Sequence, residues 1–355
     1  MTRFITLALL LLVSDSLPAA AGPDSESQAA RAAVSKSLPL LQEIGPKFWA
    51  GSGCFSCHNN TLPDIAVSIA RQGGFTIDEA TVALSRKQTL DWLDLRKDRM
   101  LEGLPPAGGQ NTMGSALFSL ALTKAPPTET LYAGARFLKL LQTADGSWQV
   151  QNHRPPLVAS SISLTAMSLL GLRAYAPPSQ KAEYGRHVDA AVSWLARANP
   201  LTTEDLAFKI LGLSWGDGSR RTIAATAGKL IAQQRDDGGW SQLPALDSDS
   251  YATGQALVAL HEAGIPAGAP VYRKGVRFLV ETQLSDGSWH VKTRSEPSQT
   301  YFESGYPHGV DQFISAAGAS WATAALALTQ PLASTLSSRA ANSGEDTHIA
   351  LFRAE

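Results

Sequence analysis

The chain has 355 residues, with a hydrophobic content of 44%, a charged content of 17% and a formal net charge of −1. This length allows one large domain or two, and the apolar content is sufficient for a sizeable core. Because the charge is balanced, we expect no nucleic-acid partner and no attraction to an anionic membrane surface. Gly and Pro recur along an Ala-rich sequence without strand-like alternation, a pattern typical of short packed helices.

Residues 1–21 have the pattern of a secretory signal peptide. Arg3 supplies a positive charge, residues 4–13 form an apolar run broken by one Thr, and small residues up to Ala21 offer a cleavage site. The run is shorter than the roughly 20 residues that a membrane-spanning helix needs. We therefore expect an exported, periplasmic protein with no membrane span after cleavage, and an uncleaved N-terminal anchor is the alternative.

The only cysteines of the chain, Cys54 and Cys57, form the pattern C-x-x-C-H together with His58. This is the attachment pattern of a c-type haem, in which both thiols bond the porphyrin and the His binds the iron. One covalent haem c, held by Cys54, Cys57 and His58, is the leading expectation. The same residues leave open a disulfide or redox dithiol, or half of a zinc site.

Internal repeats occupy most of the remaining sequence. Three segments beginning at Gln142, Gln234 and Gln283 read Q-x-x-D-G-x-W, and repetition of this kind predicts stacked helical units. In each segment the Asp-Gly pair predicts a turn that ends a helix. The Trp is expected to pack back on the structure, where its indole N–H needs a partner. A second helix, rich in small residues, is expected after each turn.

An aromatic–aliphatic pair marks the first helix of most units. The markers are Phe48, Trp92, Phe137, Trp194 and Phe278, with Lys229 at the equivalent place in one unit. The second helices are expected within residues 65–71, 115–123, 161–170, 203–213, 253–260 and 321–328. Six helix pairs over residues 35–331 predict an all-α fold, an α/α toroid around a central cavity. Periodicity alone also allows an open solenoid. Residues 332–355 are expected to form a polar tail.

The Q-x-x-D-G-x-W repeats resemble those of squalene–hopene cyclases, related terpenoid cyclases and protein prenyltransferases. The resemblance implies an α/α toroid in which the motif's Gln and Trp tie outer helices to turns. It does not extend to the cyclases' acidic D-x-D-D motif, whose nearest match is Asp247 and Asp249, and the chain has room for only one of their two domains. We therefore do not expect squalene cyclase activity. Asp249 is a weak candidate for a catalytic acid, and both Asp residues more readily cap the helix that begins near Tyr251.

The C-x-x-C-H motif falls at the turn of the first repeat, which would place a haem at one end of the barrel. His308, in the long loop of the last repeat, is the first candidate for the second iron ligand. Met113 and His153 are alternatives, and the iron site could also be open. Aromatic residues near the same end predict either a pocket for an apolar ligand or a plugged entrance.

The sequence thus predicts an exported c-type haem protein on a toroid, engaged in electron transfer with a redox protein partner. With an open iron site, it would instead perform oxidoreductase chemistry on a substrate in the cavity. Two alternatives remain. One is an enzyme that acts on an isoprenoid or another apolar small molecule with Asp247 or Asp249 as its acid. The other is a binding scaffold without chemistry.

Overall fold

The computed structural model describes residues 23–151, 153–296 and 301–331. The predicted signal peptide (1–21) and polar tail (332–355) lie outside the described residues. Within the described part the chain is helical, apart from loops and two isolated β-bridges. None of the helices described there is both long enough and apolar enough to cross a bilayer.

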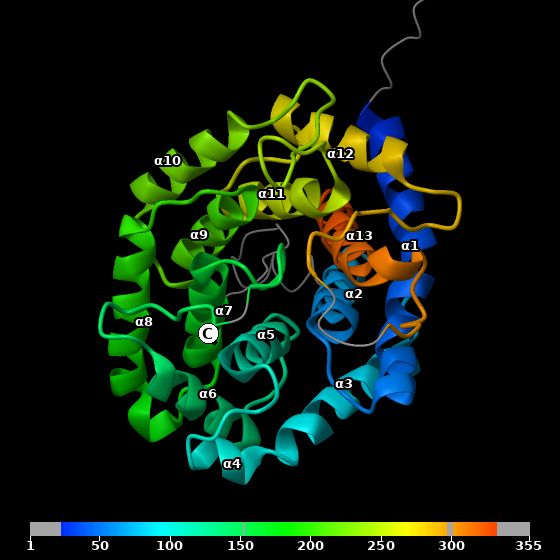
Figure 1. The fold of residues 1–355 in the computed structure, drawn as a ribbon. Coiled ribbons are helices and arrows are strands. Elements are labelled where there is room, and N and C mark those ends of the chain that lie inside the picture. The colour runs from blue at the N-terminus through cyan, green and yellow to red at the C-terminus, as the bar shows by residue number, and fades with distance from the viewer. Residues whose placement is uncertain (1–22, 152, 297–300, 332–355) are drawn as a thin grey trace, which may run out of the picture.

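Six helices form an inner ring. They are α2 (Leu62–Gln72), α5 (Gly109–Leu122), α7 (Ser161–Ala174), α9 (Thr203–Trp215), α11 (Ser250–Glu262) and α13 (Gln312–Ala327). Each contacts the next, and α13 also contacts α2, so the ring is closed (Figure 1). The predicted α/α toroid is therefore confirmed, and the open solenoid is excluded.

An outer layer surrounds this ring. It comprises α1 (Pro23–Ser52), α3 (Glu79–Asp94), α4 (Lys97–Leu101), α6 (Glu129–Leu141), α8 (Lys181–Arg197), α10 (Arg220–Ile231) and α12 (Pro270–Thr282). All six marker residues lie on these outer helices, and each predicted second helix overlaps an inner one. The six helix pairs expected from the sequence are confirmed. Short helical turns η1 (Cys57–Thr61), η2 (Pro178–Gln180) and η3 (Gly309–Asp311) complete the elements.

The inner helices pack closely because they are rich in small residues. Every residue of α13 except Phe313 is buried. A Cβ on Gly254 of α11 would lie 2.5 Å from the carbonyl carbon of Trp321 in α13, so these two backbones are nearly in contact. The outer helices are amphipathic instead: α12 buries Tyr272 and Leu279 and exposes charged side chains. This division of apolar character produces two concentric layers.

The Q-x-x-D-G-x-W turns join neighbouring repeats. In the last of them, the Gln283 side-chain amide donates to the carbonyl of Gly287 at 3.0 Å and to that of Ala33 in α1 at 2.9 Å. Trp289 is buried, and its indole N–H donates to the Leu279 carbonyl at 2.8 Å. The equivalent glutamines make the same pair of bonds, Gln142 to Gly146 and His187, and Gln234 to Gly238 and Val271. The third turn therefore closes the ring onto its first helix.

Glycine is required at the turn because the next outer helix passes directly over it. Gly287 has φ +91°, and a Cβ there would lie 2.4 Å from the backbone oxygen of Lys36 in α1. Gly146 and Gly238 have the same handedness and the same close approach to the following outer helix. A side chain at these positions would be strained by the backbone angle and would also collide with a backbone that cannot easily move.

The first repeat departs from this scheme. Gly53, with φ +61°, follows the end of α1, and Cys57 begins the π-helical turn η1. Ser56 caps this turn by accepting a hydrogen bond from the Asn59 backbone N–H at 3.3 Å. Aligning Cys57 with the turn glycines therefore finds the right region of the repeat, although Cys57 does not have their left-handed backbone.

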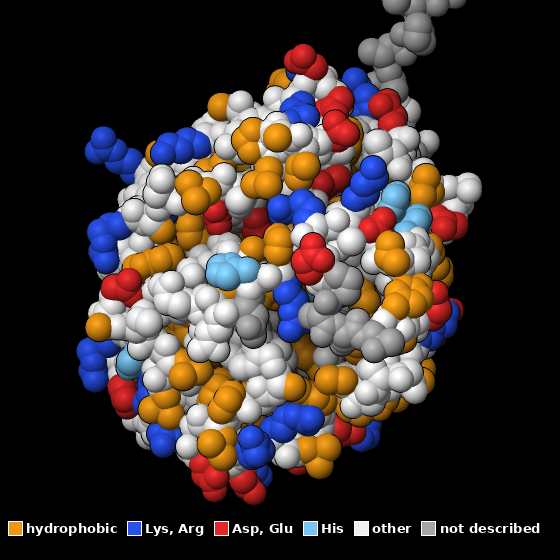
Figure 2. Space-filling model, in the orientation of Figure 1, with side chains coloured by type: hydrophobic (Ala, Val, Ile, Leu, Met, Phe, Trp, Pro, Cys, Tyr) orange, Lys and Arg blue, Asp and Glu red, His pale blue; other side chains and the backbone are white. Residues whose placement is uncertain are grey.

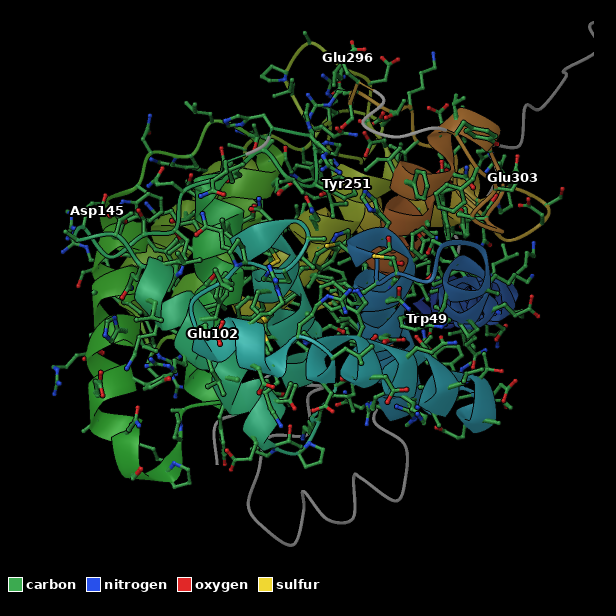
Figure 3. The ribbon with its side chains drawn as sticks, turned by 60° about the horizontal axis from the view of Figure 1, so that its bottom comes forward. Trp49, Glu102, Asp145, Tyr251, Glu296 and Glu303 are labelled. Atoms are coloured by element: carbon green, nitrogen blue, oxygen red, sulfur yellow. The ribbon has the colours of Figure 1, made fainter. Side chains whose placement is uncertain are left out.

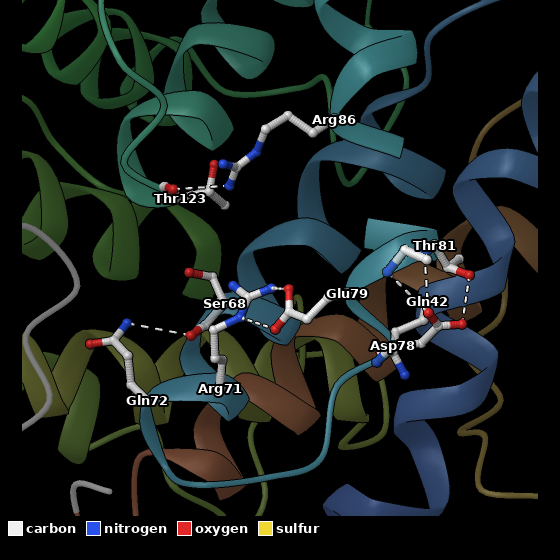
Figure 4. Close-up of polar contacts among 10 residues, drawn as sticks. Gln42, Ser68, Arg71, Gln72, Asp78, Glu79, Thr81, Arg86 and Thr123 are labelled. Carbon is white, nitrogen blue, oxygen red and sulfur yellow. Dashed lines mark hydrogen bonds and ion pairs between the residues drawn. The ribbon is translucent and has the colours of Figure 1, made fainter. Parts of the chain in front are cut away.

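Polar contacts fix the connection between α2 and α3 (Figure 4). Arg71 donates twice to the Glu79 carboxylate, at 2.7 and 2.8 Å, and thereby lowers the pKa of Glu79. Gln42 of α1 accepts the Asp78 backbone N–H at 2.6 Å, and Asp78 caps α3 through Ala80. Exposed pairs of this kind contribute up to about 1 kcal/mol each, so they orient the second repeat more than they stabilise the ring.

Candidate functional site

A narrow pocket lies between the inner helices. All six inner helices line it, together with Cys57 of η1 and the 150–160 loop of the third repeat. Its lining is Cys57, Leu62, Asn111, Ser115, Phe118, Val150, Leu157, Val158, Ser160, Ser163, Leu164, Met167, Glu204, Phe208, Tyr251, Gln255 and Trp321. The cavity has a volume of about 30 Å³, which is room for roughly two water molecules.

Glu204 is the one carboxylic acid in the lining of this pocket. It sits in the first turn of α9, where Thr202 and Asp205 form a reciprocal capping box that fixes the start of the helix. The side chain is buried, and the Tyr251 hydroxyl donates to Glu204 Oε2 at 2.9 Å. Tyr251 lies among the inner helices, whereas Glu296 lies at the outer end of the loops (Figure 3).

The surroundings of Glu204 favour its protonated form. Burial raises the pKa of this carboxyl to about 7, whereas the hydroxyls of Tyr251 and Ser163 act in the opposite direction. The neighbouring Asp205 carboxylate raises the pKa further, and the Arg294 cation lowers it. A carboxyl with this pKa can donate a proton near neutral pH, as a general acid must.

Unpartnered polar groups accompany Glu204 in the pocket. Gln255 is 1% exposed, and neither its amide oxygen nor its amide nitrogen has a hydrogen-bond partner. The indole N–H of Trp321, which is 3% exposed, is also unpartnered. Buried polar groups nearly always have partners in native proteins. The pocket therefore suits a ligand, or waters, that can both donate and accept hydrogen bonds.

Aromatic rings form one wall of the pocket. Phe208 meets Trp321 edge to face with ring centroids 5.9 Å apart, and Phe118 lies 6.2 Å from Phe208. Apolar faces beside unpartnered donors and acceptors match a molecule that has both a hydrophobic face and hydroxyl groups.

Loops of three repeats are tied together near Asp249. Arg294 Nε donates to Gln242 Oε1 at 2.7 Å, and Gln242 Nε2 donates to Asp249 Oδ2 at 2.8 Å. Ser295 donates to the carbonyl of Pro155 at 2.7 Å. Charged and His side chains surround the middle of the loop-bearing face of the ring (Figure 2). Hydrogen bonds thus join loops of the third, fifth and sixth repeats to one another.

Asp249 is a structural cap. Its Oδ1 accepts the Ala252 backbone N–H at 2.8 Å at the start of α11, as predicted. Burial raises the pKa of the Asp249 carboxyl. Asp247 is exposed and does not cap α11. Neither residue lines the pocket.

The residues of the C-x-x-C-H motif lie beside the pocket. Cys54 and Cys57 are half-buried, and Cys57 lines the pocket wall. The His58 ring packs on Phe313, with centroids 5.8 Å apart. Burial, helped by the Arg154 cation, lowers the pKa of His58 to about 4, so the ring is neutral at ordinary pH.

The three candidates for a second iron ligand lie in separate surroundings. His308 has φ +87°, hydrogen-bonds Ser288 Oγ through Nε2 at 2.8 Å and stacks on His290 with centroids 4.9 Å apart. Met113 is fully buried next to Gly134 of α6, and His153 is exposed. Among the residues that the structure describes, no hydrogen bond or ring contact joins any of the three to His58. Nor do these residues contain a group of three His, Cys, Asp or Glu side chains arranged to hold a metal ion.

Sequence reasoning missed Glu204. The available signal was an acidic residue in the first turn of a mainly apolar inner helix, two residues before Leu206, where the apolar residues of that helix begin. Its neighbour Asp205 belongs to a capping box, and the pair resembles ordinary helix-start residues. Only the tertiary structure separates the two: Asp205 bonds the helix terminus, and Glu204 lines the pocket.

Comparison with known proteins finds similar folds. A protein from Actinoplanes matches with a TM-score of 0.56 and 16% identity over 84% of this chain and 98% of its own. A possible member of the GH105 family from Salmonella enterica matches with a TM-score of 0.55 and 17% identity over 90% and 98%. Another, from Klebsiella pneumoniae, has a TM-score of 0.50 and 17% identity over 91% and 98%. No protein-family model and no curated protein matches the sequence.

These comparisons correct the family that the sequence suggested. Two of the three structures are described as possible members of the GH105 family, and none of the three is described as a terpenoid cyclase or a haem protein. The predicted relationship is therefore wrong, although the fold it implied is right. The reason is that Q-x-x-D-G-x-W specifies the turn that connects one repeat to the next. Such a turn can connect helix pairs in a closed ring independently of the function of the central pocket.

The haem prediction is also wrong, and with it the electron-transfer and haem-dependent oxidoreductase functions. The similar structures include two that are described as possible members of the GH105 family. The geometry agrees, because the His58 ring is packed against Phe313, with ring centroids 5.8 Å apart. In this arrangement the residues present do not fit a macrocycle bonded to Cys54 and Cys57. The terpenoid-cyclase alternative is wrong as well, since its acids, Asp247 and Asp249, lie outside the pocket.

Proposed function

We propose that the protein is a carbohydrate-active hydrolase that binds a sugar in the central pocket and uses Glu204 as its general acid. The observation that carries the proposal is the buried Glu204 carboxyl, whose pKa is about 7, inside a pocket with unpartnered polar groups. The similarity to two structures described as possible GH105 members, a glycoside hydrolase family, supports it.

The pocket offers the groups that recognise a sugar. The Gln255 amide can both donate and accept, and the Trp321 indole N–H can donate to a ring hydroxyl. The apolar C–H face of a sugar ring can pack on Phe208 or Trp321. A sugar ring enters only when the lining residues move apart, because the present space admits little more than water.

Glu204 then has one chemical task. Its proton is transferred to the oxygen that leaves when the bond to the sugar carbon breaks, and water attacks that carbon. The attacking water releases one proton to solvent, and the Glu204 carboxylate takes up one proton from solvent, which restores the acid. Tyr251, which donates to Glu204 Oε2, holds the carboxyl in place and stabilises the carboxylate that forms. Because the acid must be protonated, we expect activity to fall as the pH rises above about 7, the pKa of Glu204.

Hydrolysis of a panel of aryl glycosides and oligosaccharides by the purified protein tests this proposal. Glu204→Gln should lower kcat by about 100-fold or more, since general acids contribute that much. Asp249→Asn is the matched control: Asn also caps helices, so this variant should remain active. Activity that is unchanged in Glu204→Gln, or absence of both binding and turnover across the panel, would refute the proposal.

A further inference from the structure

The segment between α1 and α2 carries both cysteines of the chain and has no role in the proposed hydrolysis. Both thiols are free, both are half-buried, and both pack against the hydrophobic core. Cys54 lies in the turn after α1, and Cys57 lines the central pocket. Two residues separate them, so their α-carbons lie within about 10 Å even in a fully extended chain.

The backbone of this segment is irregular. Ser56 is extended, with φ −136° and ψ 132°, and is followed by the π-helical turn that begins at Cys57. The Leu62 N–H bonds the Cys57 carbonyl, one residue beyond the α-helical spacing. Single π-turns are rare and often mark functional sites.

Contacts on either side hold the turn in place. Phe55, between the two cysteines, is buried and lies 5.6 Å from Trp92 of α3 by ring centroids. The Ser56 N–H donates to Asn60 Oδ1 at 3.1 Å, and the Cys54 N–H donates to Ser52 Oγ at 3.1 Å. The cysteines therefore stay near each other without being fixed by a regular helix.

The two thiols also influence each other electrostatically. Burial raises the pKa of Cys57, and the nearby Cys54 acts in the same direction. Cys54, in the turn after α1, is placed to react first with an oxidant, and Cys57 is placed to complete the reaction from within the pocket wall.

We propose that Cys54 and Cys57 are a reversible dithiol–disulfide pair whose oxidation reshapes the wall of the central pocket. The Cys54 thiolate attacks a disulfide oxidant and releases one thiol. The Cys57 thiolate then attacks the Cys54 sulfur and releases the second thiol. The protein loses two protons and two electrons, and the disulfide oxidant takes them up as it becomes two thiols. The predicted export of the protein would bring this pair to a compartment where disulfides persist.

The link to the pocket is direct. Cys57 contributes to the pocket lining, and η1 contacts α5 and α13 as well as α1. In the proposed disulfide the Cys57 sulfur is bonded to Cys54, in the turn after α1, so the part of the pocket wall that Cys57 forms changes. The disulfide itself does not rest on the proposed hydrolysis; only its effect on turnover does.

Mass spectrometry of the full-length protein tests the pair. The protein is equilibrated in buffers of defined reduced-to-oxidised glutathione ratio, treated with iodoacetamide and weighed. We expect two alkylated thiols under reducing conditions and none under oxidising conditions, the oxidised chain being two hydrogens lighter. Cys54→Ser and Cys57→Ser should each stop at a mixed disulfide with one glutathione. Tryptophan emission should change on oxidation of the wild type and remain constant in both variants.

Two results would overturn the proposal. One is full alkylation of both cysteines after equilibration with excess glutathione disulfide. The other is a purified protein whose cysteines already carry another covalent group. Because the wild-type mass decides the question, unstable variants would not leave it open. Disulfide formation in a protein that hydrolyses no glycoside would refute the proposed function alone.

Discussion

Replacing Gly287 with alanine tests whether the ring is closed by direct contact between the last turn and the first helix. Gly287 has φ +91°, and its added Cβ would lie 2.4 Å from the Lys36 backbone oxygen. Gly264 is the matched control, because it has φ +84° and no heavy atom within 4 Å of its Cβ position. Both substitutions strain the backbone, and only Gly287→Ala adds a collision.

The magnitudes follow from these two terms. Left-handed backbone costs an alanine about 1 kcal/mol, and we expect this loss of unfolding free energy for Gly264→Ala. Overpacking against atoms that cannot move adds about 1–3 kcal/mol, so Gly287→Ala should lose about 2–4 kcal/mol in total. Urea unfolding followed by circular dichroism measures both, with equal m-values as the check that the native states are comparable. Equal losses in the two variants would refute close packing between the last repeat and α1.

Three further predictions follow from single contacts. Glu204→Gln should become more stable relative to the wild type as the pH rises from 4.5 to about 7, by up to about 3 kcal/mol of unfolding free energy. The reason is that the wild type, whose carboxyl pKa is raised in the folded state, loses stability across that pH range. Urea unfolding midpoints at pH 5 and pH 8 measure the difference between the two proteins, and a difference that does not change with pH would contradict the prediction. Gln283→Leu should speed amide hydrogen exchange in α1, which its side chain holds through Ala33, whereas Gln142→Leu, at an internal joint, should not. Asp249→Ala should lose about 1 kcal/mol with the α11 cap, and a thermal melt identical to the wild type would exclude that role.

The helical repeats were predictable because they depend on local chemistry. Asp-Gly favours a turn after a helix, and Trp148, Trp240 and Trp289 recur at repeat spacing with an N–H that needs a partner. In the structure each indole bonds a carbonyl of its own outer helix. The Asp249 cap was predictable for the same reason, since it satisfies the N–H groups of the turn that follows it.

The site was less predictable. Glu204 and Gln255 are 51 positions apart in the sequence. They line the same pocket only because the six inner helices surround it. The C-x-x-C-H motif led to a wrong prediction of haem attachment. Attachment requires space around the thiols and the imidazole, and a local sequence pattern does not determine that space. Here His58 is packed against Phe313.

The sequence by itself determined the class of fold, the number of helix pairs and the turns that join them, because each follows from residues close together in the chain. Tertiary structure alone decided that the ring closes, which carboxyl is buried in its centre and how little room lies beside Cys57. Those properties arise from contacts between distant residues. Burial, which raises the pKa of Glu204 and leaves Gln255 unpartnered, exists only once the ring has formed.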